Sequence, residues 1–431
     1  MHDTQQVTSP RWSRLRRAVA LCACGVTAVA LALPAPAQDR APAGNDGDAP
    51  PAIEDPSGSM AHYYGRLRAA ARRQPGAVAR MALYGESTNA TDRVTSALRR
   101  RLQQRFGDAG KGWVPIAPGW PAQRHQDVTW SQEGRWRTWV VNRNDGPLSR
   151  YGLGGVVATN RTAHPRATFA TTDSGRGGRA VSRYRLFYQA WPDGGDVALA
   201  IDSGAPTTLR TAATEVADRV HEISVSDGAH RLEVGVGSGQ VRLYGVVMER
   251  NRPGAVVDGL MLVGAFTRVL LHFDPDHWQR QVALREVDLL AFWLGGNDSV
   301  SRTTGFSYGR YVQTYAEALR RARRGRPQAS CLVVSVIDAG ENVDGAIRTV
   351  PRVPRVVAAQ RDAARQAGCA FFDLFEAAGG SGTMRRWRSA APRLAEGDYE
   401  HLTQAGARRV GEILYQAVAK GYDDFVAAGG S

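Results

Sequence analysis

The feature that most constrains the fold is an alternation of apolar runs with amphipathic helical segments, interrupted by one long stretch without helical periodicity. Short apolar runs bounded by glycine or polar residues predict buried strands, and apolar residues spaced by three and four predict helices. The predicted strands are 78–84, 256–262, 288–294, 331–337 and 370–375, and the predicted helices are 60–73, 91–106, 308–323, 353–367 and 403–415. This order predicts an α/β domain with a parallel, doubly wound sheet.

Residues 113–250 have a different pattern, without a convincing helix. Apolar and polar residues alternate at 184–188, 197–201, 223–225, 232–236 and 241–245, and glycine-containing turns separate these runs at 193–195, 226–228 and 237–239. Alternation with period two is typical of half-buried strands. The stretch therefore predicts an all-β insert of jelly-roll or sandwich type. It divides the α/β domain into a first part, 60–112, and a second part, 251–431.

The N-terminal segment has the plan of a secretory signal peptide. Four arginines precede an apolar stretch at 18–33, and Ala35-Pro36-Ala37 offers a small-residue cleavage site. A membrane anchor is the rival interpretation, but the stretch is marginal in length for a bilayer. We expect a signal peptide over 1–37, a disordered linker over 38–59, and an exported protein that is periplasmic or extracellular.

The chain carries a formal net charge of +14, of which residues 1–37 contribute +3, so +11 remains on the rest. Lys111 and Lys420 are its only lysines, and arginine supplies nearly all of the positive charge. Attraction to anionic partners such as acidic glycans is one explanation; the codon bias of a GC-rich genome is the other. No zinc-finger spacing or nucleic-acid motif is present, so a nucleic-acid partner is not expected.

Two cysteines remain beyond the predicted signal peptide, Cys331 and Cys369, each at the start of an apolar run. If the two runs are neighbouring parallel strands, the thiols lie at one level, and an oxidising compartment permits a disulfide. The geometry of adjacent strands is often poor for such a bridge. The sequence leaves both outcomes open.

The residues of a nucleophilic hydrolase occur at the predicted strand ends and before the last helix. Ser87 follows the first strand, where we expect the positive end of a helix to favour negative charge. A serine hydroxyl needs a base and the base needs an orienting partner, and His401 with Asp398 three residues earlier supplies both. The alternatives are a serine that caps a helix and a solvated histidine in a loop.

Four short blocks together resemble those of the SGNH (GDSL-type) hydrolases. They are Gly85-Glu86-Ser87, Gly264, Gly295-Gly296-Asn297-Asp298 and Asp398-x-x-His401, in the order of that family. The resemblance covers about 78–112 and 254–418. It is closest to the branch with an inserted β carbohydrate-binding-like domain, which includes peptidoglycan and polysaccharide O-acetylesterases. The resemblance implies a three-layer α/β/α sandwich.

The resemblance also implies the role of each site residue. Ser87 would be the nucleophile, His401 the general base and Asp398 its orienting partner. Oxyanion donors would be the amides of Ser87 and Gly264 and the side chain of Asn297. No cofactor and no metal is implied. The chain departs from the family at two positions: Glu86 stands where aspartate is usual, and Val263 where asparagine is frequent.

The resulting hypothesis is an exported serine esterase that removes O-acyl groups, with O-acetyl expected, from a polysaccharide or peptidoglycan. Such a substrate would bring peripheral contact with the cell envelope. An O-acyltransferase that uses the same site is one alternative, and a non-catalytic carbohydrate-binding protein on a hydrolase scaffold is the other. The sequence indicates no oligomeric state.

Three further segments carry weaker signals. Residues 272–277 contain metal-ligand residue types, but a solvated loop is the favoured interpretation. The glycine-rich segment 151–155 is interpreted as a strand turn. Five tryptophans could stack on sugars or fill the junction between insert and α/β domain, and packing is favoured; they are Trp113, Trp120, Trp130, Trp136 and Trp139.

Overall fold

The computed structural model describes residues 52–143, 145–160, 164–173 and 178–430. The predicted signal peptide and residues 38–51 of the predicted linker lie outside this range. Residues 52–59 lie inside it, and for them the prediction of disorder is wrong. Glu54 pairs with Phe371, and the Asp55 carboxylate accepts the amides of Ser59 and Met60. Backbone pairing at the sheet edge and this Asp55 turn give the polar segment a defined structure.

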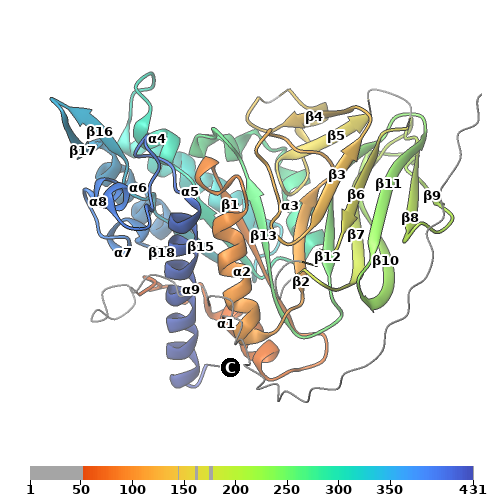
Figure 1. Cartoon of the computed structure of the whole chain (residues 1–431), viewed down its shortest axis with the longest axis horizontal. Helices are drawn as coiled ribbons and strands as arrows, with labels where there is room; N and C mark the ends of the chain where they lie inside the picture. The colour runs from red at the N-terminus through yellow and green to blue at the C-terminus, as the bar shows by residue number, and fades with distance from the viewer. Residues whose placement is uncertain (1–51, 144, 161–163, 174–177, 431) are drawn as a thin grey trace, which may run out of the picture. The chain divides into compact units, whose positions relative to one another are not determined.

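A five-stranded parallel sheet forms the centre of the α/β domain, in the order β13-β1-β14-β15-β18 (Figure 1). Its strands are β1 Val78–Gly85, β13 Gly254–Met261, β14 Leu289–Trp293, β15 Ser330–Val334 and β18 Ala370–Phe372. The register places Gly85 beside both Met261 and Trp293 at the carboxyl ends. The loops that follow these strands therefore leave from one edge of the sheet, where α/β proteins bind their ligands.

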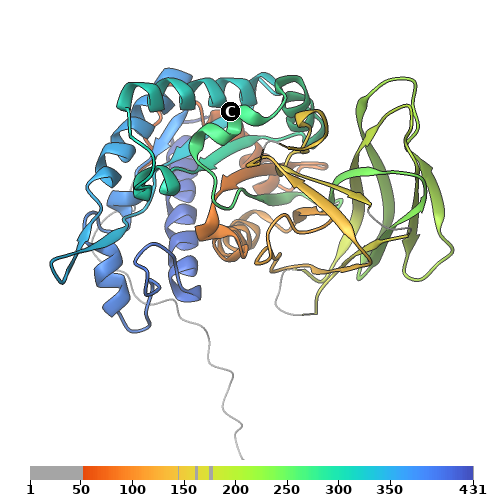
Figure 2. The same cartoon turned by 90° about the horizontal axis from the view of Figure 1, so that it is seen from above.

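Helices cover both faces of this sheet (Figure 2). One hydrophobic cluster joins one face to α1 Ala61–Ala71, α2 Arg93–Phe106 and α9 Gln404–Ala427. Another joins the opposite face to α3 Pro275–Arg285, α5 Tyr308–Arg324 and α6 Arg352–Ala367. The strands are buried on both sides because each face carries its own apolar layer. The three-layer α/β/α prediction is confirmed.

Two antiparallel sheets form the insert. The larger runs β10-β7-β12-β5-β4, with β2 also paired to β12, and the smaller runs β3-β6-β11-β8-β9. The bounds are β2 Gly110–Pro115, β3 Thr129–Glu133, β4 Trp136–Val140, β5 Val156–Asn160, β6 Arg166–Ala170, β7 Val181–Ala190, β8 Asp196–Ile201, β9 Thr207–Arg210, β10 Ala217–Gly228, β11 Arg231–Ser238 and β12 Arg242–Glu249. Side chains from both sheets share one apolar core, which confirms a sandwich.

The larger sheet of the insert also packs against the α/β domain. On β7, Leu186 faces the sandwich core whereas Phe187 joins the α/β cluster. Buried charges reinforce the junction: Arg285 of α3 donates to Glu249 of β12 at 2.7 Å and to Asp258 of β13 at 2.8 Å. The pairing of β2 starts at Gly110, shortly before the predicted start of the insert at 113.

The interpretation of 272–277 as a solvated loop is wrong. A 3-10 turn, η3 Thr267–His272, leads into α3, and the Asp274 side chain caps that helix at the amide of His277. The His277 side chain is buried, bonds Asp218 of β10 at 2.7 Å and accepts the amide of Gly152. A polar partner on either side of the ring removes the cost of burying the imidazole.

The segment 151–155 is part of the same junction. Its Leu153 carbonyl accepts the Tyr84 hydroxyl at 2.9 Å, which ties the insert to β1. The five tryptophans all pack on one of the hydrophobic cores, in agreement with the packing interpretation, and Trp113 is almost fully buried. Among the described residues, no group of three or more His, Cys, Asp and Glu side chains is arranged to hold a metal ion.

Several short elements were not predicted from the sequence. They are the turns η1 Ser87–Asn89 and η2 Pro147–Ser149, the helices α3, α4 Gly296–Val300, α7 Leu374–Ala377 and α8 Thr383–Ser389, and the hairpin β16 Gly340–Val343 with β17 Ala346–Thr349. The last helix, α9, continues well past its predicted end at 415. Its added turns bury Val418 and Tyr422 against the α1–α2 side, and this tertiary packing extends the helix.

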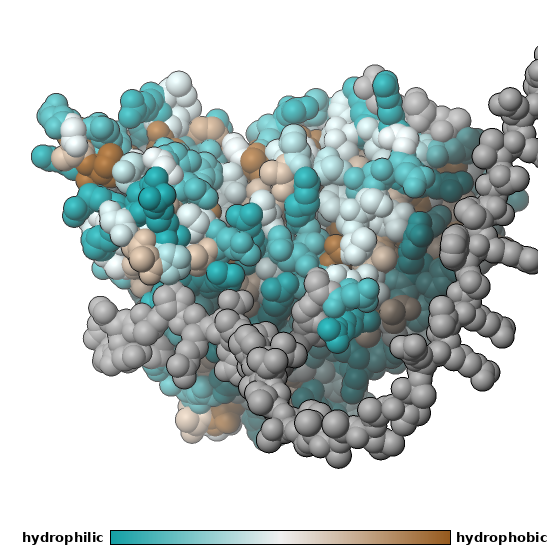
Figure 3. Space-filling model, in the orientation of Figure 1, coloured by the Kyte–Doolittle hydropathy of each residue, from teal (hydrophilic) through white to brown (hydrophobic). Residues whose placement is uncertain are grey.

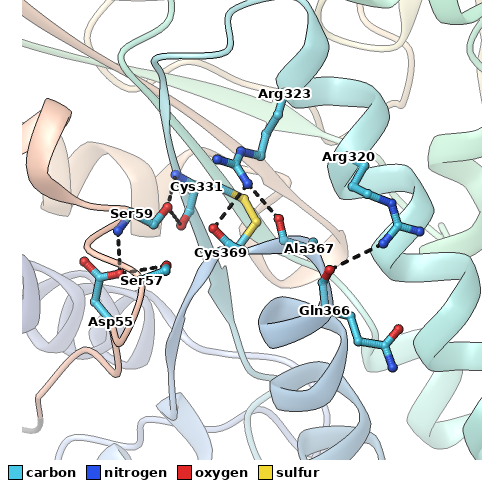
Figure 4. The surroundings of a disulfide bond; sticks show 10 residues. Asp55, Ser57, Ser59, Arg320, Arg323, Cys331, Gln366, Ala367 and Cys369 are labelled. Atoms are coloured by element: carbon cyan, nitrogen blue, oxygen red, sulfur yellow. Dashed lines mark hydrogen bonds between the residues drawn. A yellow bond between two sulfur atoms is a disulfide. The ribbon is translucent and has the colours of Figure 1, made fainter.

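A disulfide joins Cys331 of β15 to Cys369, the residue before β18 (Figure 4). Their Cα atoms are 4.8 Å apart, and the bridge settles the alternative that the sequence left open. Ser59 lies beside it and both donates to and accepts from the Cys331 backbone at 3.2 Å. The bridge therefore fixes the edge strand next to the ordered N-terminal segment.

The face seen in Figure 3 is predominantly hydrophilic. Large exposed hydrophobic side chains in the described ranges are scattered over different elements: Leu148, Val216, Tyr308 and Val426. No helix of the described part of the chain is long and apolar enough to cross a membrane.

Candidate active site

Ser87, His401 and Asp398 form one hydrogen-bonded chain at the carboxyl edge of the sheet. The Ser87 hydroxyl lies 3.0 Å from His401 Nε2, and His401 Nδ1 lies 2.7 Å from Asp398 Oδ2. Because Asp398 accepts the Nδ1 proton, Nε2 is left to accept the proton of the serine. These are the contacts that a nucleophile, a base and an orienting carboxylate require.

The loop before α9 holds His401 and Asp398 in this arrangement. Asp398 Oδ1 accepts the backbone amides of Glu400 and His401, both at 3.0 Å. Burial by itself raises the pKa of Asp398, but these amide hydrogen bonds and the bond to the imidazole lower it overall. The loop closes on α9, where the Thr403 side chain caps the helix by accepting the amide of Gly406 at 3.1 Å. The carboxylate is thus held ionised beside the histidine.

Ser87 sits in a tight turn rather than at the start of a long helix. It opens η1, and α2 begins only at Arg93, so the expected effect of a long helix's positive end at Ser87 is not supported. Asn89 fixes the turn to α2, because its amide bonds both the hydroxyl and the backbone amide of Thr95. The strand end and this anchor determine the direction of the serine side chain.

Glu86, which precedes Ser87, is buried and bonds the first turn of α4. Its Oε1 accepts the amide of Gly296 at 2.7 Å, and its Oε2 accepts the amide of Asn297 at 3.3 Å and the Asn297 side chain at 2.9 Å. A Cβ at position 296 would lie 2.2 Å from Glu86 Oε1, so the close approach requires glycine. Burial raises the pKa of Glu86 from its usual 4.5 to about 7, although these donors oppose the shift.

Asn297 links Glu86 to the glycine loop. Its Nδ2 donates to Glu86 Oε2 and also to the carbonyl of Ala265 at 3.0 Å. An amide nitrogen has two hydrogens, so both are engaged in this state. To serve as an oxyanion donor, as the sequence predicts, Asn297 has to exchange one of these two acceptors for the oxyanion.

Gly264 lies in the turn after β13 with a φ of +73°, a conformation that glycine adopts without strain. It is exposed, and it is missing from the described residues that line the cavity at Ser87. Gly264 directly precedes Ala265, whose carbonyl accepts the side-chain amide of Asn297. The amide of Gly264 thus remains a predicted oxyanion donor.

The cavity at Ser87 is small, with a volume of about 60 Å³. Ser87, His401 and Asn297 line it together with apolar side chains: Trp293, Val300, Val336 and Ile337. The histidine and aspartate side chains are 42% and 50% exposed. Ser87 is therefore reached from open solvent, whereas the space beside it admits only a small group.

The pKa of Glu86 predicts how stability changes with pH. Because the folded state holds the proton more tightly than the unfolded chain, the contribution of Glu86 to the free energy of unfolding falls as pH rises from 4.5 to about 7. A shift of this size corresponds to about 2–4 kcal/mol. Glu86→Gln removes the titration. We therefore expect the free energy of urea unfolding to fall less between pH 4.5 and pH 8 in the variant than in wild type. The changed hydrogen bonding also shifts the free energy of unfolding of the variant by a constant amount at every pH. Curves of this free energy against pH that run parallel for the two proteins would contradict the prediction.

The hairpin β16–β17 supports the catalytic loop and was missed from the sequence. The amide of Gly340 donates to the carbonyl of Tyr399 at 2.9 Å, directly between Asp398 and His401. Asp344 and Gly345 form its turn, with φ of +51° and +81°. An Asp-Gly pair between two short alternating runs is a recognised hairpin signal, and it could have revealed the element.

The chain was compared with known proteins. Residues 229–409 match the GDSL-like Lipase/Acylhydrolase family. That range contains Gly264, Asn297, Asp398 and His401; Ser87 lies outside it, ahead of most of the insert. A comparison with curated protein sequences returned no match.

Solved structures share the fold. A peptidoglycan O-acetylesterase structure aligns with a TM-score of 0.72 at 23% identity, over 86% of this chain and 98% of the other. A family two carbohydrate esterase from Cellvibrio japonicus aligns with a TM-score of 0.28 at 12% identity, over 69% and 99%. An acetyl xylan esterase aligns with a TM-score of 0.30 at 18% identity, over 38% and 73%. Only the first likeness is high enough to support the arrangement of both domains. Residues 229–409 are thus similar in sequence to the GDSL-like Lipase/Acylhydrolase family, the SGNH hydrolases, and the α/β fold agrees with that similarity.

Proposed function

We propose that the protein is an exported serine esterase that removes short O-acyl groups, acetyl above all, from a polysaccharide or peptidoglycan. The observation that carries the proposal is the continuous hydrogen-bonded chain from Ser87 through His401 to Asp398. A non-catalytic scaffold would not need a histidine 3.0 Å from the serine with its other nitrogen held by a carboxylate. The match of residues 229–409 to the GDSL-like Lipase/Acylhydrolase family supports the same reaction class.

In the proposed mechanism, Ser87 Oγ attacks the acyl carbonyl carbon while its proton passes to His401 Nε2. The tetrahedral oxyanion is stabilised by the amides of Ser87 and Gly264 and by Asn297 after it exchanges an acceptor. His401 then protonates the departing sugar oxygen, which leaves an acyl-enzyme on Ser87. Water, deprotonated by His401, attacks this ester and releases the carboxylic acid.

The size of the cavity supports a short acyl group. Pockets for drug-sized ligands usually have about 300–1,000 Å³, far above the volume of about 60 Å³ beside Ser87. The apolar side chains that line part of the cavity suit a methyl group, and the exposed histidine and aspartate admit a bulky alcohol part. The open triad also gives water access to the acyl-enzyme, which favours hydrolysis over transfer to a sugar.

Two features support export. The N-terminal segment has the signal-peptide pattern, and the Cys331–Cys369 disulfide is typical of proteins that fold in an oxidising compartment.

The experiment that tests the function measures acetate release from a panel of O-acetylated glycans, peptidoglycan included, with a chromogenic acetate and a chromogenic octanoate ester as small substrates. We expect acetate release from at least one glycan and a clear preference for the acetate ester, because the cavity excludes the long chain. A sugar acceptor added to the same reaction shows whether the acyl group goes to water. Failure to cleave any of these esters, or faster cleavage of octanoate, would contradict the proposal.

A further inference from the structure

A wide groove adjoins the active-site cavity. It has a volume of about 790 Å³ and shares Ser299, Val300 and Glu400 with the cavity at Ser87. Its walls are the hairpin β16–β17, the segment after α4, the first turn of α6 and the loop 397–400. The hairpin projects from the α/β domain at the upper left of Figure 1. The groove is large enough for sugar units of a polymer, and it leads directly to the nucleophile.

Three arginines line this groove: Arg302, Arg352 and Arg355. Arg302 is 83% exposed and lies 3.4 Å from Glu341. Arg352 Nη1 donates to the backbone carbonyls of Asp298 and Ser301. Arg355 is exposed, and its guanidinium carbon lies 5.4 Å from the Phe306 ring centre. Among the described residues, no carboxylate forms an ion pair with Arg352 or Arg355, so their charges are not neutralised by the protein.

Arg352 and Arg355 also occupy an unfavourable place on their helix. They stand at the first and fourth positions of α6, and its first turn has no acidic residue. The amino end of a helix carries a partial positive charge, which is stabilised by anions and destabilised by cations. Two unpaired arginines there add to the positive potential in the groove.

The groove also has three acidic side chains: Glu341, Asp398 and Glu400. Glu341 pairs with Arg302 and Asp398 pairs with His401. Glu400 stands where the groove meets the Ser87 cavity, and burial, followed by the charge of Asp398, raises its pKa. Arg352 and Arg355 are thus the arginines of the groove that have no carboxylate partner among the described residues.

The groove also offers surfaces suited to sugar rings. Tyr399, Pro351 and Ile347 present aromatic and aliphatic faces, and Asn342 adds an amide. These faces lie among the polar and charged side chains that make up most of the lining.

We propose that this groove binds a carboxylate-bearing glycan chain, with Arg355 and Arg352 recognising a carboxylate while an O-acyl ester of the same chain lies at Ser87. The inference rests on the proposed function and adds that acidic glycans are preferred over neutral ones. The carboxylate can belong to a uronic acid or to the lactyl or peptide part of peptidoglycan. Arginine is the side chain best suited to bind a carboxylate through two hydrogen bonds.

The test compares acetate release from O-acetylated polyuronate, O-acetylated peptidoglycan fragments and neutral O-acetylated xylan. We expect wild type to show a kcat/KM at least about tenfold higher for an acidic polymer at low salt, and most of this preference to disappear when NaCl rises from about 0.05 M to 0.5 M. Arg355→Glu should lower the ratio of kcat/KM for the acidic polymer to kcat/KM for the neutral one by about tenfold, mainly through KM. Arg355→Lys should retain part of the preference for the acidic polymer. The polymer that responds to these variants identifies the source of the carboxylate.

Arg365→Glu is the matched control, because Arg365 lies on the same helix, is 69% exposed and is outside the groove. It should keep the wild-type preference. An unchanged preference in Arg355→Glu, or equal rates on acidic and neutral polymers in wild type, would overturn the inference. If wild type cleaves the chromogenic acetate yet lacks the preference, the groove proposal fails and the esterase proposal stands.

Binding supplies a readout that does not depend on catalysis. Titration calorimetry with deacetylated oligouronate and with deacetylated peptidoglycan fragments should show at least about tenfold weaker binding to Arg355→Glu than to wild type for one of them. Melting curves confirm that the variants are folded. If wild type and Arg355→Glu bind each of the two ligands with equal affinity, the groove proposal is refuted, even if no ester is cleaved.

Discussion

Replacing Ser87 by alanine is expected to lower kcat/KM for a chromogenic acetate ester by at least about a thousandfold, because the acyl-enzyme can no longer form. The turn η1 does not depend on the hydroxyl, since Asn89 and Thr95 anchor it to α2. The melting temperature should therefore change little. Stopped assays at several enzyme concentrations measure the residual rate. Equal rates for wild type and variant would exclude Ser87 as the nucleophile.

Variants of the other two residues separate their roles. His401→Ala should lower kcat/KM almost as much as Ser87→Ala does. The double variant should lose little more activity, because the effects of residues that act as one unit are not additive. Asp398→Asn should also be severely impaired, since an amide can no longer hold the imidazole as the right tautomer. Independent, additive losses would contradict a single proton-transfer chain.

Replacing Arg285 by methionine is expected to lower the free energy of unfolding by about 3–5 kcal/mol, the usual cost of removing one partner of a buried ion pair. Arg285, Glu249 and Asp258 have no exposed side-chain surface. Glu249 retains Arg80 and Arg183 as partners, but Asp258 loses its arginine and keeps the amide of Trp113. Urea unfolding of wild type and variant measures the difference.

Arg280→Met is the control, because Arg280 lies on the same helix and its side chain is exposed. It should change stability by less than about 0.5 kcal/mol. Asp258→Asn should lower the free energy of unfolding less in the Arg285→Met background than in wild type, because in that background it removes an unpaired charge. If Arg285→Met and Arg280→Met are equally stable, the buried network does not hold the insert against the α/β domain.

The arrangement of the fold follows from local patterns. The strands at 78–84 and 370–375 are short apolar runs, and α5 and α6 have strong helical spacing, so their elements could be assigned within a few residues. The alternating runs of the insert likewise led to the sandwich. Ser87, Asn297 and His401 could be assigned to one edge because parallel strands place their carboxyl ends together.

Features that depend on tertiary contacts could not be read in the same way. Residues 52–59 have the composition of a linker, yet Glu54 pairs with the sheet edge. His277 looked solvated because its partner Asp218 lies on a distant strand of the insert. The two acceptors of Asn297 and the unpaired arginines of the groove involve loops far apart in sequence. Such contacts carry no local periodicity, and local pattern therefore does not reveal them.

Covalent labelling of the nucleophile tests the central claim most directly. A serine-reactive phosphonate ester mimics the acyl group, and after incubation intact-mass and peptide mass spectrometry locate the adduct. We expect one adduct per chain, on Ser87, absent from Ser87→Ala and formed far more slowly by His401→Ala. An adduct on another residue, or full esterase activity with Ser87 unlabelled, would contradict it.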